Sequence, residues 1–142
     1  MVSASRMIGF VSALCIGGFA CGGQALAQSA SVALVQQDQS DCTNANVKDN
    51  HGEAPGGTID ILRNQDGSTS VKVGLSATPL TTYDFYLKCV RALGVIKTDE
   101  DGVGEAVFTI PAGGVGAVFA FDSYPAGAPP GNKFQSVQVQ LK

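Results

Sequence analysis

The chain has 142 residues, with 9 Lys and Arg against 12 Asp and Glu, one His, four Cys, 18 Gly and no Trp. This length allows one ordinary domain. A single histidine excludes a metal site built from several imidazoles, and a net charge of −3 provides no basic face for nucleic acid. The composition therefore predicts a small, mildly acidic domain and identifies no activity by itself.

Residues 1–27 have the pattern of a secretory signal peptide. Arg6 precedes an apolar stretch over residues 7–20, and Ala25-Leu26-Ala27 supplies the small residues that a signal peptidase requires. We expect cleavage before Gln28. The mature chain is then secreted or periplasmic, with no transmembrane segment.

Two alternatives for this segment stay open. A lipid anchor on Cys21 is disfavoured because Gly18-Phe19-Ala20 lacks the residues that normally precede a lipidated cysteine. A membrane-spanning helix needs about 20 apolar residues, and this stretch is shorter and interrupted by glycines.

After cleavage the chain keeps one pair of cysteines, Cys42 and Cys89. An even pair in an oxidising compartment predicts a disulfide. Closing a loop of this length stabilises a domain by roughly 4 kcal/mol in the chain-entropy model. The alternative is a redox-active thiol pair, but such motifs usually place their cysteines two residues apart.

From Gln28 onward, apolar and polar residues alternate with a period of two between turns rich in Gly, Pro, Asn and Asp, and no stretch predicts a helix. Asn64-Gln65-Asp66-Gly67 predicts a tight hairpin, with Gly67 at positive φ. The expected strands cover residues 32–36, 58–62, 71–76, 83–89, 95–98, 106–110, 115–121 and 136–141.

Seven or eight antiparallel strands predict an all-β, immunoglobulin-like Greek-key sandwich. We expect residues 28–142 to form one domain. Within it, residues 28–55 are an N-terminal segment with a first strand and a polar loop, and residues 56–142 are the body of the sandwich.

The run Thr78-Pro79-Leu80-Thr81-Thr82-Tyr83 resembles the corner of immunoglobulin-like and fibronectin type III domains, where a Pro-x-Thr-x-Tyr sequence crosses between sheets. Pro79, Thr81 and Tyr83 match it, and Ala77 replaces the usual leucine. Pro79 should fix a turn, and the phenol of Tyr83 should hydrogen-bond to backbone while its ring fills the core.

A longer stretch, residues 57–95 followed by residues 98–104, resembles copper/zinc superoxide dismutase-like and chordin-domain-like sandwiches. The strand that should offer a His-x-His pair carries Phe85-Tyr86-Leu87 instead, so we do not expect dismutase activity. Residues 102–111 are also similar to a turn and strand of many small secreted bacterial domains.

The acidic loop at residues 99–105 is a candidate calcium site. Asp99, Asp101 and Glu105 offer hard oxygen ligands beside two glycines, although the spacing fits only part of an EF-hand loop. The alternative is a solvated hairpin turn. A second candidate metal site, Asp49-x-His51-x-Glu53 with Asp41 nearby, has one imidazole and is a poor anchor for zinc.

Catalysis is not expected. A Ser-His-Asp triad would have to use His51, and no Gly-x-Ser-x-Gly sequence presents a nucleophile. The sequence does not rule out a carboxylate pair for glycoside hydrolysis, but a domain of this size rarely builds the cleft for it.

Tyr86 and Tyr124, the latter in a Pro- and Gly-rich loop, are candidates for a binding surface. The loop would otherwise merely connect sheets, and the absence of Trp makes sugar binding a minor option. If the last strand, residues 136–142, lies at a sheet edge, it could also add to a partner's strand. The sequence thus favours a non-catalytic structural or binding module with a protein or cell-surface partner, and a calcium-dependent module is the alternative.

Overall fold

The computed structural model describes residues 28–50, 53–127 and 133–141, and the regular elements in these ranges are β-strands. The predicted signal peptide lies outside the described residues. Within the described ranges, no helix is long and apolar enough to cross a membrane. The strands are β1 (Gln28–Gln36), β2 (Gly56–Arg63), β3 (Thr69–Ser76), β4 (Thr82–Leu87), β5 (Arg91–Lys97), β6 (Val103–Ile110), β7 (Val118–Phe119), β8 (Phe121–Pro125), β9 (Phe134–Ser136) and β10 (Val139–Gln140).

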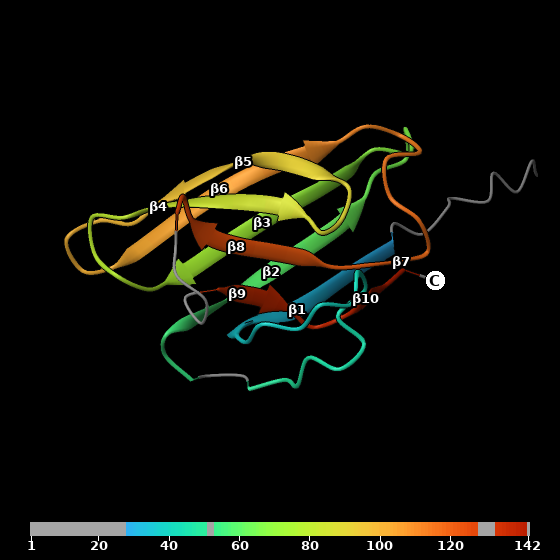
Figure 1. Cartoon of the computed structure of the whole chain (residues 1–142). Coiled ribbons are helices and arrows are strands. Elements are labelled where there is room, and N and C mark those ends of the chain that lie inside the picture. Colours follow the sequence, from blue (N-terminus) through green and yellow to red (C-terminus); the bar gives the residue numbers. More distant parts are fainter. Residues whose placement is uncertain (1–27, 51–52, 128–132, 142) are drawn as a thin grey trace, which may run out of the picture.

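Eight strands form one antiparallel sheet that curls on itself. Its order is β5-β4-β8-β9-β1-β2-β3-β6, and β7 and β10 form a separate two-stranded ribbon. Figure 1 shows β4, β5 and β8 lying across β2, β3 and β6. The two end strands, β5 and β6, meet at Gly104, where an added Cβ would lie 2.6 Å from the backbone oxygen of Lys97. The sheet is therefore barrel-like.

This arrangement confirms the antiparallel all-β class, whereas the immunoglobulin-like sandwich is not shown. Such a sandwich has two separate sheets packed face to face. Here β1 pairs with β9 through Leu34–Ser136 and Gln36–Phe134, so the two layers belong to one continuous sheet.

The hairpin between β2 and β3 forms where the turn residues predict it. Gly67 has a φ of 85°, and its amide donates to the carbonyl of Asn64 at 3.0 Å. The strand expected over residues 83–89 ends earlier, at Leu87, because Cys89 has a φ of 60° and belongs to the following turn.

The strands expected at residues 115–121 and 136–141 are each interrupted. Between β7 and β8, the carbonyl of Ala120 accepts a hydrogen bond from the amide of Lys88 at 2.9 Å. Between β9 and β10, the amide of Val137 donates to the carbonyl of Ala33 at 3.0 Å. These bonds hold Ala120 beside the turn after β4 and Val137 beside β1, while β7 and β10 pair with each other in the separate ribbon.

The interior of the curled sheet is the main core, filled by alternate residues of each strand. The ring of Phe85 lies between those of Phe108 and Phe121, with centroid separations of 5.1 and 5.2 Å. The buried residues of this core are Leu34, Ile59, Ile61, Val71, Val73, Leu75, Tyr83, Phe85, Leu87, Ile96, Ile110, Phe119, Phe121, Phe134, Val139 and Leu141.

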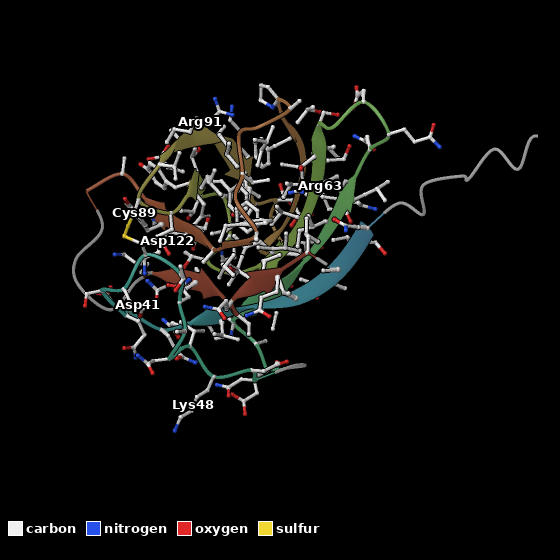
Figure 2. The ribbon with its side chains drawn as sticks, turned by 90° about the vertical axis from the view of Figure 1, so that its right-hand side faces the viewer. Asp41, Lys48, Arg63, Cys89, Arg91 and Asp122 are labelled. Atoms are coloured by element: carbon white, nitrogen blue, oxygen red, sulfur yellow. A yellow bond between two sulfur atoms is a disulfide. The ribbon has the colours of Figure 1, made fainter. Side chains whose placement is uncertain are left out.

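A second, smaller core lies on the outer side of the sheet. Ala33 and Val35 of β1 pack with Val47, and Val137 is partly buried against them. Val47 belongs to residues 37–50, a segment that we call the covering loop. Figure 2 shows this loop, with Asp41 and Lys48, on the outer side of β1. The outer face of the sheet is thus partly covered.

The contact between β5 and β6 should be sensitive to one methyl group. Replacing Gly104 by Ala places a Cβ against Lys97, and such overpacking costs about 1–3 kcal/mol of unfolding free energy. Gly74→Ala on β3 is the control, because nothing lies within 4 Å of its added Cβ. Urea denaturation of both variants tests this, and equal stability would contradict the close approach of β5 and β6.

Candidate functional site

The candidate site is built on the outer face of β4, β8 and β9. Strand register places Tyr86 opposite Asp122, Asp84 opposite Tyr124, and Asp122 opposite Gln135. Residues directly opposite each other in an antiparallel pair share one face of the sheet. All five side chains therefore belong to the outer face, the side on which the covering loop packs.

The covering loop is held to this face by side-chain to backbone hydrogen bonds. The amide nitrogen of Gln39 donates to Oε1 of Gln135 at 2.7 Å, and Nε2 of Gln135 donates back to the carbonyl of Gln39 at 3.0 Å. Within the loop, Nε2 of Gln37 donates to the carbonyl of Lys48 at 2.8 Å. The loop therefore has a defined conformation although it contains no strand.

The predicted disulfide is confirmed. Cys42 and Cys89 are bonded, with their Cα atoms 5.5 Å apart and a sequence separation of 47. Both cysteines are exposed. The bond ties the covering loop to the turn that follows β4.

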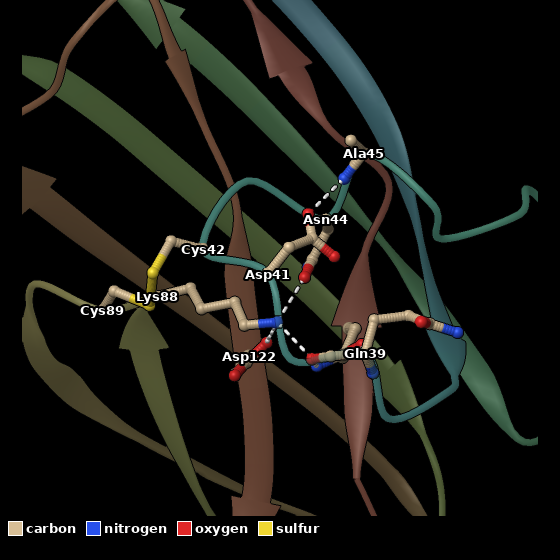
Figure 3. Close-up of a disulfide and its surroundings, with 9 residues drawn as sticks. Gln39, Asp41, Cys42, Asn44, Ala45, Lys88, Cys89 and Asp122 are labelled. Atoms are coloured by element: carbon tan, nitrogen blue, oxygen red, sulfur yellow. Dashed lines mark hydrogen bonds and ion pairs between the residues drawn. A yellow bond between two sulfur atoms is a disulfide. The ribbon is translucent and has the colours of Figure 1, made fainter.

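A buried polar cluster lies directly beside the disulfide (Figure 3). Nζ of Lys88 donates to Oδ1 of Asn44 at 2.5 Å and to the carbonyl of Gln39 at 2.6 Å. It also lies 3.9 Å from Oδ1 of Asp122. Lys88 is 7% exposed, Asp122 6% and Asn44 0%. The amine of Lys88 is thus buried between the loop and the sheet.

Asn44 is fixed on its other side by the sheet. Its Nδ2 donates to the carbonyl of Ser136 at 2.9 Å and to that of Phe121 at 3.4 Å. The residue has a φ of 53°, a left-handed conformation that asparagine tolerates better than most residues. The amide group therefore has one orientation, with its oxygen toward Lys88.

Asp122 is a buried acid whose charge is incompletely compensated. Burial raises the pKa of its carboxyl above the ordinary value of 3.8, although the charges of Lys88 and Lys133 and the amides of Asn44 and Gln135 oppose that increase. Its Oδ1 accepts no hydrogen bond. The environment thus favours the protonated acid more than water does.

Next to this cluster, Tyr86 and Tyr124 form a stacked pair. Their ring centroids are 4.9 Å apart at an interplanar angle of 17°. Nζ of Lys133 lies 5.1 Å from the centre of the Tyr124 ring and 3.1 Å from Oδ1 of Asp38 in the covering loop. Partial burial, followed by interactions with Tyr124 and Asp84, raises the pKa of the Tyr86 phenol. The pair presents aromatic surface flanked by charges of both signs.

The structure does not bring the candidate calcium ligands together. Oδ1 of Asp99 accepts hydrogen bonds from the amides of Asp101 and Val103, both at 2.9 Å, as in an ordinary polar turn. Glu105 lies further along β6, opposite Gly74. Within the described ranges, no three Asp, Glu, His or Cys side chains are grouped so that they could hold a metal.

The second candidate metal site is only partly described. His51 lies outside the described residues. The Asp41 carboxylate accepts from the amide of Ala45 at 2.7 Å, so it organises the covering loop locally.

The corner residues Pro79, Thr81 and Tyr83 do lie together. The phenol oxygen of Tyr83 accepts a hydrogen bond from the amide of Thr78 at 3.1 Å, and its ring is fully buried. The hydroxyl of Thr81 donates to the carbonyl of Pro79 at 2.9 Å. These residues fix the crossing into β4, the strand that carries Tyr86.

Sequence reasoning missed Lys88, Asn44 and Asp122. Lys88 immediately precedes Cys89 and Asn44 follows Cys42 by two residues, so the predicted disulfide already implied that these two are neighbours. For Asp122 no such signal exists, because its burial depends on a loop that is distant in sequence.

Compared with family models, curated proteins and solved structures, the chain shows no match. The site is therefore interpreted from its own geometry.

The raised pKa of Asp122 predicts a pH dependence of stability. In the folded state the carboxyl binds its proton more tightly than in the unfolded state, so its contribution to unfolding free energy falls as pH rises above 3.8. We expect the stability of the wild type relative to Asp122→Asn to decrease between about pH 3 and pH 7. Urea denaturation of both proteins across this range measures the difference in their unfolding free energies. The contributions of the other carboxyl groups are the same in both proteins and cancel in this difference. A difference that increases with pH would contradict the assignment.

Proposed function

We propose that the protein acts outside the cytoplasm as a non-catalytic binding module and recognises a protein partner through Tyr86 and Tyr124. The observation that carries this proposal is the stacked, partly exposed tyrosine pair with Lys133 beside it. Tyrosine is enriched at the centres of protein interfaces because its ring supplies contact area and its hydroxyl a hydrogen bond.

The surroundings of the pair suit recognition. Tyr86 and Tyr124 stand on adjacent strands of a rigid sheet, and Asp38 of the covering loop holds Lys133 in place. Immunoglobulin-like domains, which the sequence resembles, likewise carry recognition surfaces on a β scaffold. A preorganised surface loses less conformational entropy on binding.

Two sequence features support the extracytoplasmic location. Residues 1–27 have the signal-peptide pattern, and a disulfide persists in oxidising compartments. The non-catalytic character is supported by the single histidine of the chain and by the lack of a nucleophile motif.

Peptides selected from a random display library on the intact protein provide the probe. We expect Tyr86→Ala and Tyr124→Ala each to weaken the binding of the selected peptides by roughly thirty-fold, the effect of losing an interface hot spot. The control is Val107→Ala, since Val107 is 68% exposed on β6 and lies outside the aromatic pair. Isothermal titration calorimetry measures the affinities.

If the selected peptides bind a variant that carries both Tyr86→Ala and Tyr124→Ala as tightly as the wild type, the tyrosine pair is not the binding surface. Selection of oligosaccharides but no peptides, in a parallel glycan array, would keep a binding module but reject a protein partner.

A further inference from the structure

We propose that the side chains of Lys88 and Asn44 become joined by an amide bond, an intramolecular isopeptide cross-link, with Asp122 as the acid–base group. The basis is a buried amine placed against a buried carboxamide, with a buried carboxyl group beside both (Figure 3). This proposal is independent of the tyrosine surface.

The reacting atoms are already close. Nζ of Lys88 lies 2.5 Å from Oδ1 of Asn44. Because a C=O bond is about 1.2 Å long, Nζ is within about 3.7 Å of Cγ, the carbon that the amine would attack. Reacting atoms held about 3–3.5 Å apart are in a near-attack arrangement, and such positioning replaces a bimolecular encounter by an intramolecular step.

Both partners are held in place. The carbonyl of Gln39 fixes the amine of Lys88 from the side of the covering loop, at 2.6 Å. The carbonyl of Ser136 fixes the amide nitrogen of Asn44 from the side of the sheet, at 2.9 Å. Before reaction the amine only has to shift from its hydrogen bond with Oδ1 to the face of the neighbouring carbon Cγ.

The disulfide brings the two segments together. Cys42 is two residues before Asn44, and Cys89 directly follows Lys88. Once the Cys42–Cys89 bond has formed, the loop and the turn after β4 stay close, and the lysine side chain needs only to lie along the same seam. The cysteines act here as positioning residues.

The step balances without a further reactant. A proton passes from Nζ of Lys88 to the carboxylate of Asp122, and the free lone pair attacks Cγ of Asn44. The Nζ–Cγ bond forms, a second proton from Nζ passes through Asp122 to Nδ2, and the Cγ–Nδ2 bond breaks to release ammonia. The ammonia then takes the remaining proton from Asp122, which returns to the carboxylate. Nothing is oxidised or reduced, and the net change is one lysine ammonium and one carboxamide converted to one secondary amide and one ammonium ion.

The position of Asp122 suits this role. Its Oδ1 lies 3.9 Å from Nζ of Lys88 and accepts no hydrogen bond, so it is available for the proton. Both groups are buried, so the transfer takes place in a low-dielectric environment. The covering loop also limits the access of water, which would compete with the amine and yield aspartate from Asn44.

Intact mass measured on the reduced, denatured protein that begins at Gln28 is the first test. We expect a mass lower than that of the sequence by one ammonia molecule. Tryptic digestion should then give a branched peptide that contains Asn44 and Lys88, with no cleavage after Lys88.

Three variants test which residues take part in forming the cross-link. Lys88→Met and Asp122→Asn should each abolish the branched peptide and the associated mass loss while circular dichroism and the disulfide remain unchanged. The control is Lys48→Met in the covering loop, an exposed lysine that should leave the cross-link intact.

A linear peptide with a free Lys88 in the folded wild-type protein would overturn the proposal, whatever the variants do. An ammonia loss that persists in Lys88→Met and maps to an N-terminal Gln28 would be cyclisation of that glutamine and would likewise overturn it. A branched peptide that still forms in Asp122→Asn would remove Asp122 from the mechanism.

Discussion

The outer surface of this protein depends on the burial of one amine. Lys88 lies at the seam between the covering loop and the sheet, and its Nζ contacts the loop through Asn44 and Gln39. A buried cation without partners is strongly unfavourable, so the loop must stay in place for Lys88 to remain there. Conversely, if the loop lifted, Asn44 would lose its hydrogen bonds to Lys88 and Ser136, and Gln39 would lose its hydrogen bonds to Lys88 and Gln135. The covering loop and Lys88 therefore stabilise each other's position through these hydrogen bonds, in addition to the disulfide.

Alternation alone predicts several strands and which of their residues are buried, but it does not predict that the sheet is barrel-like. Val71, Val73 and Leu75 point inward and are fully buried, as the period of two requires. The hairpin at Gly67 follows from turn chemistry that acts over a few residues. These features are local, and local information is what a single sequence carries most directly.

The remaining features depend on contacts between distant segments. At the break between β7 and β8 the carbonyl of Ala120 bonds to the amide of Lys88, and β7 pairs with β10, which is distant in sequence. Asp122 lies on the outer face, where alternation predicts exposure, yet it is buried because the covering loop packs over it. In the candidate site the two tyrosines were identified from sequence, but their stacking follows from the register of β4 and β8.

The proposed amide bond would add little to the stability of the fold. Its main effect would appear when the disulfide is reduced. Asn44 and Lys88 are 44 residues apart, and the disulfide already closes a loop of 47, so a second closure removes little additional chain entropy. Its effect would be to keep the covering loop attached after the exposed Cys42–Cys89 bond is reduced. The covering loop is also linked to the tyrosine pair. Its Asp38 forms an ion pair with Lys133, and Lys133 lies over the ring of Tyr124. A loop fixed by an irreversible bond would thus keep the tyrosine pair preorganised in any redox environment, which links the buried chemistry at Lys88 to recognition at the surface.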